Sequence, residues 1–150
     1  MYPIVLGLHN LVRWVALVLA IVATVGAFSG WFGKRQWSER DRKIGSFFGM
    51  AMDIQLLLGL ILYFVYSPIT RQALSNFGAA MGVGDLRFFG LEHALYMILA
   101  VVSAHLGSAL ARRAAESKAK YQRAAIFFGL SLLLMLLGMP WMRPFIPFLG

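Results

Sequence analysis

Residues 4–32 read IVLGLHNLVRWVALVLAIVATVGAFSGWF and contain one charged side chain, that of Arg13. A hydrocarbon layer about 30 Å thick is crossed by roughly 20 helical residues, so this stretch is long enough to span a membrane. No basic residue precedes it, and it is too long for the apolar core of a signal peptide. We therefore predict a retained membrane span.

Three more apolar stretches follow the first. The four lie at about residues 4–32, 44–66, 86–110 and 124–141. None alternates with the period of two that is typical of barrel strands, and backbone groups in lipid must be hydrogen-bonded within their own segment. We predict an all-α integral membrane protein, a single up-down four-helix bundle over residues 1–150. Residues 69–80, after Ser67-Pro68, predict a short interfacial helix between spans two and three.

The composition excludes most water-soluble functions. The chain is 60% apolar and 13% charged, whereas globular chains are about 45–50% apolar and about 25% charged. It has no cysteine, so disulfides, thiolate metal sites, iron–sulfur clusters and covalently attached haem are excluded. The glycine-loop, zinc-protease and serine-elbow motifs are also missing from the sequence, so we do not predict a nucleotide-dependent enzyme or a hydrolase.

The net charge of +8 comes mainly from two connecting segments. Residues 34–43 contain five basic side chains, and residues 112–123 contain another five. Basic loops face the cytoplasm and attract anionic headgroups, so we interpret both segments as topology signals and exclude nucleic acid as a partner. This predicts a multi-pass protein of a bacterial inner membrane, in contact with the lipid bilayer and with both termini in the periplasm.

Ionisable side chains inside the spans predict a functional site, because each costs on the order of 2.5–3.5 kcal/mol to insert into lipid. His9 and His93 lie about 8 Å and about 10 Å into spans one and three. These spans run parallel, so the two imidazoles should lie at similar depth. Facing imidazoles can supply both axial ligands of a b-type haem. The alternative is that each histidine only hydrogen-bonds across helices or lies in headgroup water.

Two more residues belong to this candidate site. Arg13 lies four residues after His9 on the same helical face, where it could pair with a haem propionate or a quinone oxygen. An ion pair with Glu92 is the alternative. Tyr96, one turn after His93, is either a hydrogen-bond donor or an interface aromatic. The predicted cofactor-binding residues are His9, Arg13, His93 and Tyr96, with His9 and His93 as the iron ligands.

A second polar pair is predicted closer to the basic loops. His105 lies about 18 Å deeper than His93 and is rotated by roughly 120°, so the two should not bind the same haem. Asp53 has a depth similar to that of His105. A buried Asp53–His105 pair could orient the imidazole for a second cofactor, relay a proton, or only neutralise two polar groups. Gln55 is rotated by about 200° from Asp53 and should contact a different neighbour.

Several motifs together resemble a known family. They are His9-Asn10-Leu11-Val12-Arg13-Trp14, the run IQLLLGLILYF at residues 54–64, Arg87-Phe88-Phe89 with Glu92-His93, and Pro140-Trp141. Their order and spacing, over nearly the whole chain, resemble small four-span bacterial membrane proteins labelled cytochrome b or cytochrome b-like. The resemblance implies a b-type haem, carried here by His9 and His93, and electron transfer in the membrane.

One position departs from that family. Its members often have histidine where Asp53 stands, whereas the extra histidine here is His105 in the next span. We therefore expect one haem b at the outer level, and two haems are the alternative.

Two functions remain open at this point. The first is a membrane-embedded haem electron carrier that exchanges electrons with quinol near the periplasmic surface and with other membrane redox subunits. The second is a non-catalytic helical accessory subunit of a larger respiratory or photosynthetic membrane complex. Transport at the Asp53–His105 level would need a polar path that the sequence barely supplies. We predict an electron-transfer protein rather than a stand-alone enzyme.

Overall fold

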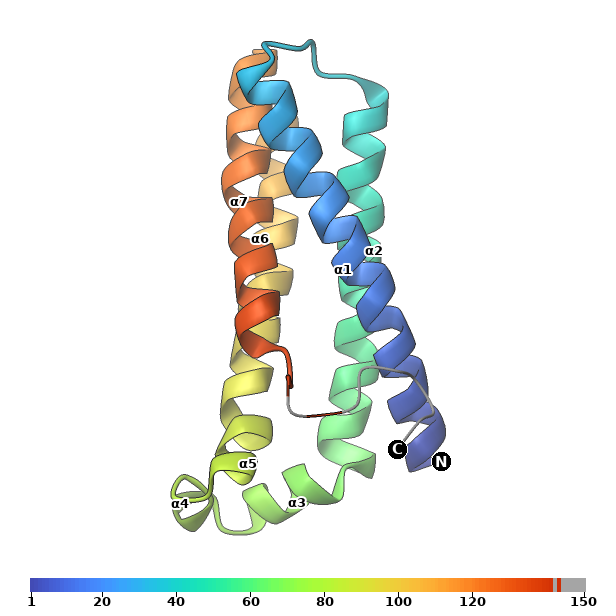
Figure 1. Cartoon of the computed structure of the whole chain (residues 1–150), viewed down its shortest axis with the longest axis vertical. Coiled ribbons are helices and arrows are strands. Elements are labelled where there is room, and N and C mark those ends of the chain that lie inside the picture. The colour runs from blue at the N-terminus through green and yellow to red at the C-terminus, as the bar shows by residue number, and fades with distance from the viewer. Residues whose placement is uncertain (142, 144–150) are drawn as a thin grey trace.

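The computed structural model describes residues 1–141 and 143, and its body consists of four long helices (Figure 1). These are α1 (Tyr2–Phe32), α2 (Glu39–Ile61), α6 (His93–Arg113) and α7 (Ser117–Gly138). The connection from α2 to α6 contains α3 (Pro68–Ser75), α4 (Phe77–Ala80) and α5 (Gly84–Arg87). It also contains two π-helical turns, η1 (Leu62–Tyr66) and η2 (Phe88–Glu92).

The predicted all-α fold is confirmed over the described residues, which contain helices and no strands. Among them, four helical segments are long and apolar enough to cross a membrane: Tyr2–Phe32, Glu39–Tyr66, Gly84–Arg113 and Ser117–Gly138. The chain is thus a multi-pass membrane protein. The predicted periplasmic C-terminus lies outside the described residues.

The second span begins earlier than its apolar stretch suggested. Helix α2 starts at Glu39 rather than near residue 44, because Ser38 and Asp41 form a capping box. The Ser38 backbone N–H donates to Asp41 Oδ2 at 3.0 Å, and the Asp41 backbone N–H donates to Ser38 Oγ at 3.3 Å. A capping box satisfies backbone donors that have no partner inside the helix, so the helix continues into the polar segment.

The long helices pack in the cyclic order α1, α2, α6, α7, with the most extensive contact between α6 and α7. Figure 1 shows the two loops that join α1 to α2 and α6 to α7 at one end, with α3 and α4 at the other. We call these the basic-loop end and the short-helix end. The first and third spans run parallel, as predicted.

Small side chains allow the helices to approach closely. Ala16 and Ala20 of α1 are fully buried, and Phe48 and Phe128 fill the interior with ring centroids 5.6 Å apart. Lipid is as apolar as leucine, so close packing and interhelical hydrogen bonds hold such a bundle together. Large apolar side chains point outward instead and form the surface that lipid covers. Three examples that are more than half exposed are Val18, Leu57 and Leu133.

Hydrogen bonds close both ends of the bundle. At the basic-loop end, Tyr121 Oη donates to Asp41 Oδ2 at 2.8 Å, which ties α7 to α2. At the short-helix end, the helix predicted over residues 69–80 is present as two shorter helices, α3 and α4, because Asn76 leaves the helical conformation and caps α4. Helix α3 begins at Pro68 after the N-cap Ser67, and Thr70 Oγ1 donates to the Tyr63 carbonyl at 2.7 Å. Pro68 suits the first helical turn because its missing N–H would have no helical partner there.

Candidate functional site

His9 and His93 face each other near the short-helix end of the bundle. Their ring centroids are 6.4 Å apart and their planes are inclined by 68°. This contact confirms that the two imidazoles lie at matched depth on parallel spans. Phe88 and Phe89 pack beside the His93 ring, with centroid distances of 5.9 and 6.1 Å, so the surroundings of His93 are largely apolar.

The His93 ring is oriented by the end of α7. Its Nδ1–H donates to the Gly138 carbonyl at 2.7 Å, a carbonyl that has no partner within its own helix. This bond places the ring proton on Nδ1 and leaves the Nε2 lone pair available to a ligand. A glycine is required at this position, because a Cβ at residue 138 would lie 2.7 Å from Tyr96 Cβ. Tyr96 thus packs directly against the group that orients His93.

The His9 ring contacts α2. Its Nε2 lies 3.1 Å from Gln55 Nε2, and Gly59 leaves room for the ring, because a Cβ there would lie 3.3 Å from His9 Cε1. Among the described residues, His9 Nδ1 and Gln55 Oε1 are buried without a hydrogen-bond partner. Exchanging the nearly isosteric amide oxygen and nitrogen of Gln55 would let His9 Nε2–H donate to the oxygen. His9 Nδ1 would then be a buried acceptor that a ligand can satisfy.

Arg13 is 8% exposed, and its guanidinium carbon lies 5.6 Å from the centre of the Trp14 ring. It is close enough for its charge to act on both His9 and His93. The alternative ion pair with Glu92 is wrong. In the described part of the chain, Glu92 Oε1 instead accepts from Arg87 Nε at 2.6 Å. The predicted contact of Arg13 with a cofactor stays a prediction.

Two irregular helical turns lie at the same end. The π-helical turn η2 ends at Glu92, directly before His93, and η1 begins three residues after Gly59. Tyr63 Oη of η1 donates to the Gly90 carbonyl of η2 at 2.6 Å and joins the two turns. A π-helical turn changes the rotation of every residue that follows it, and such turns are frequent at functional sites. No sequence signal predicted them.

Asp53 and His105 form the second predicted pair. His105 Nε2 lies 2.7 Å from Asp53 Oδ1, and the contact between α2 and α6 is confirmed. The prediction that the pair is buried is wrong, because about half of each side chain is exposed, 50% for His105 and 53% for Asp53. The reason is the rotation of α2 and α6 about their own axes, which places both side chains on the outer side of the α2–α6 contact. Gly49 leaves room for the imidazole there, since a Cβ would lie 3.3 Å from His105 Cε1.

Sequence reasoning missed the groups that orient the histidines. Gln55 was expected to turn away from Asp53, which is confirmed, but its contact with His9 was not predicted. An amide inside a membrane span was the available signal. The Gly138 carbonyl had none, because every residue has a carbonyl and only the packing of α7 on α6 brings this one to His93.

The donor set is small. Within residues 1–141 and 143, no three side chains of His, Cys, Asp or Glu gather closely enough to hold a metal ion. The search for similar proteins found no matching family model, curated protein or solved structure. The function is therefore inferred from the site's own residues.

Proposed function

We propose that this chain is a membrane-embedded b-type haem electron-transfer protein in which His9 and His93 are the axial ligands. The observation that supports this most directly is the 6.4 Å separation of the two facing imidazoles. Two imidazoles at this separation would both be close enough to hold one metal centre, since metal–imidazole bonds are about 2 Å long. A haem supplies four ring nitrogens itself and needs only two protein donors.

The neighbouring residues suit this role. A metal-bound histidine commonly donates its second ring N–H to a carbonyl, and His93 makes that bond to Gly138. Phe88 and Phe89 keep water from the His93 ring, and Arg13 would pair with a propionate and favour the reduced state through its positive charge. Tyr96 would hold the His93 side of the site against α7. The group bound there would supply one-electron transfer.

The position of the site in the bundle points to the exchange partners. His9 lies near the start of α1 and His93 begins α6, so both lie toward the end opposite the basic loops, which by the positive-inside rule faces the periplasm of a bacterial inner membrane. The described residues at that end form only short helices, α3 to α5, and no separate domain for a water-soluble substrate. We therefore propose quinol and other membrane redox subunits as the partners.

Absorption spectroscopy of the purified protein tests the ligand assignment. The wild-type chain, expressed with sufficient haem, should show a six-coordinate low-spin spectrum with sharp bands on reduction. His9→Ala and His93→Ala should each abolish that spectrum, because each removes one axial ligand. His105→Ala is the matched control and should retain it, since His105 lies about 18 Å along α6 from His93.

Two results would contradict the proposal. One is a folded wild-type protein that stays colourless when haem is supplied, and the other is an unchanged spectrum in the His93 variant. Circular dichroism of each variant separates loss of ligand from loss of fold. The accessory-subunit function would then be favoured by the half-exposed Asp53–His105 pair, because polar groups in a span normally face protein rather than lipid.

A further inference from the structure

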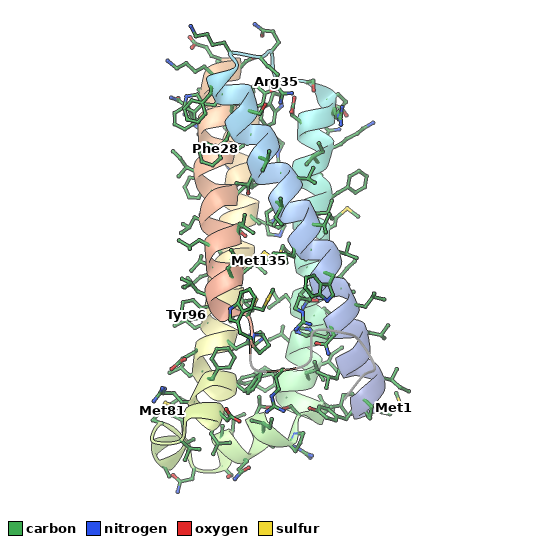
Figure 2. All side chains as sticks on the ribbon, in the orientation of Figure 1. Met1, Phe28, Arg35, Met81, Tyr96 and Met135 are labelled. Carbon is green, nitrogen blue, oxygen red and sulfur yellow. The ribbon has the colours of Figure 1, made fainter. Side chains whose placement is uncertain are left out.

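A cleft of about 380 Å³ opens between α1 and α2 near the basic-loop end. Its lining is apolar along the helices and basic at the mouth. The lining residues are Ile21, Val22, Val25 and Gly26 of α1, Arg35 of the loop, and Arg40 and Ile44 of α2. Figure 2 shows Arg35 at the loop end of the bundle. The apolar wall would suit the acyl chain of a phospholipid, and the two guanidinium groups at its end would suit an anionic headgroup.

Gly26 keeps the cleft open. A Cβ built at this residue would meet no atom within 4 Å, so the space beside α1 is open here and only a larger side chain would fill it. The Gly26 carbonyl also accepts from Arg35 Nη2 at 3.1 Å, which holds the guanidinium over the mouth. The same glycine therefore provides the space and positions one of the charges.

The charges at the mouth favour an anion. Residues 34–43 contain five basic and two acidic side chains. Both acidic side chains already have a basic partner. Asp41 Oδ1 lies 3.5 Å from Arg35 Nη2, and Glu39 pairs with Arg42. Arg40 forms no ion pair with any described residue, and it is exposed beside the cleft. Its guanidinium is thus available to a phosphate oxygen.

We propose that this cleft binds one anionic phospholipid, with an acyl chain against Val22 and Val25 and the headgroup phosphate between Arg35 and Arg40. Basic pockets between helices at the cytoplasmic surface bind acidic headgroups, and here the acyl chain and the phosphate have separate, adjacent surfaces. The lipid would belong to the leaflet at the basic-loop end. The inference does not depend on the proposed haem site, which lies at the other end of the bundle.

Native mass spectrometry of the full-length protein tests this site. The detergent-purified chain is equilibrated with equal amounts of phosphatidylglycerol and phosphatidylcholine that have the same acyl chains. We expect one retained phosphatidylglycerol. Gly26→Leu should remove it by filling the cleft, and Arg40→Gln should weaken its retention about fivefold by removing one charge. Arg113→Gln at the end of α6, beside the other basic loop, and Val18→Leu on α1 are matched controls that should retain the lipid.

Equal retention of the two lipids would overturn the proposal, because the basic mouth would then select nothing. Wild-type retention in either Gly26→Leu or Arg40→Gln would also overturn it, since both residues line the same cleft. Arg40 is exposed, so its variant keeps the fold and remains informative if the glycine variant is unstable.

Discussion

At the scale of single residues, the candidate site depends on groups that have little chemistry of their own. An amide, that of Gln55, contacts one imidazole, and a main-chain carbonyl, that of Gly138, orients the other. Both contacts position the rings, and the Gly138 carbonyl also places the His93 proton on Nδ1, which leaves Nε2 as the nitrogen that can bind a ligand. Gln55 and Gly138 are accordingly positioning residues for His9 and His93.

The Asp53–His105 contact is testable at the same scale. Asp53→Asn, His105→Gln and the double variant should give a coupling energy of about 1 kcal/mol in the free energy of unfolding, measured in bicelles. Interhelical hydrogen bonds in membranes average about 0.6 kcal/mol, and fully buried ion pairs cost about 3–5 kcal/mol when one partner is removed. The Asp53–His105 contact is a single interhelical hydrogen bond, so we expect a coupling energy near the lower figure. Strictly additive losses would show that the contact contributes nothing.

At the scale of elements, two glycines on one face of α1 have opposite roles. A Cβ at Gly30 would overlap the Tyr121 ring of α7, whereas a Cβ at Gly26 would meet nothing within 4 Å. Tyr121 cannot swing aside freely, because its hydroxyl donates to Asp41 on α2. Close packing of α1 on α7 at the basic-loop end therefore depends on Gly30.

Alanine substitutions distinguish these two roles. Gly30→Ala should destabilise the bundle by about 1–3 kcal/mol, the usual cost of overpacking, and should lower the midpoint of thermal unfolding in detergent. Gly26→Ala, one turn earlier on the same helix, is the control and should unfold at the wild-type temperature or slightly above it, because alanine favours the helix and meets no neighbour there. Equal midpoints for the two variants would mean that α1 and α7 do not approach each other as closely as the structure indicates.

At the scale of the whole molecule, four crossings put both basic loops at one end and the short helices at the other. The asymmetry of basic residues predicts which end faces the cytoplasm. Reporter fusions after residues 40 and 116 should be active only as cytoplasmic reporters, and a fusion after residue 76 only as a periplasmic one. The reverse pattern would invert the orientation, and a mixed pattern would contradict four crossings.

Hydropathy and spacing were sufficient for the four spans, the interfacial helix and the matched depth of His9 and His93. These are properties of a local stretch, because a membrane fixes the length of a span and each helical residue advances by 1.5 Å. Such one-dimensional arithmetic gives depth along a helix. The same calculation predicted a similar depth for Asp53 and His105, and the two side chains are in contact in the structure.

Rotation about the helix axes was decided only by the tertiary structure. It turns Gln55 toward His9, brings the end of α7 to His93, and leaves Asp53 and His105 half exposed on the outside of the bundle. It also separates Arg13 from Glu92, which pairs with Arg87. These outcomes depend on which helices are neighbours and, for α6, on the extra residue that the π-helical turn η2 inserts before His93. Both are set by packing between segments far apart in the chain, and hydropathy contains no record of them.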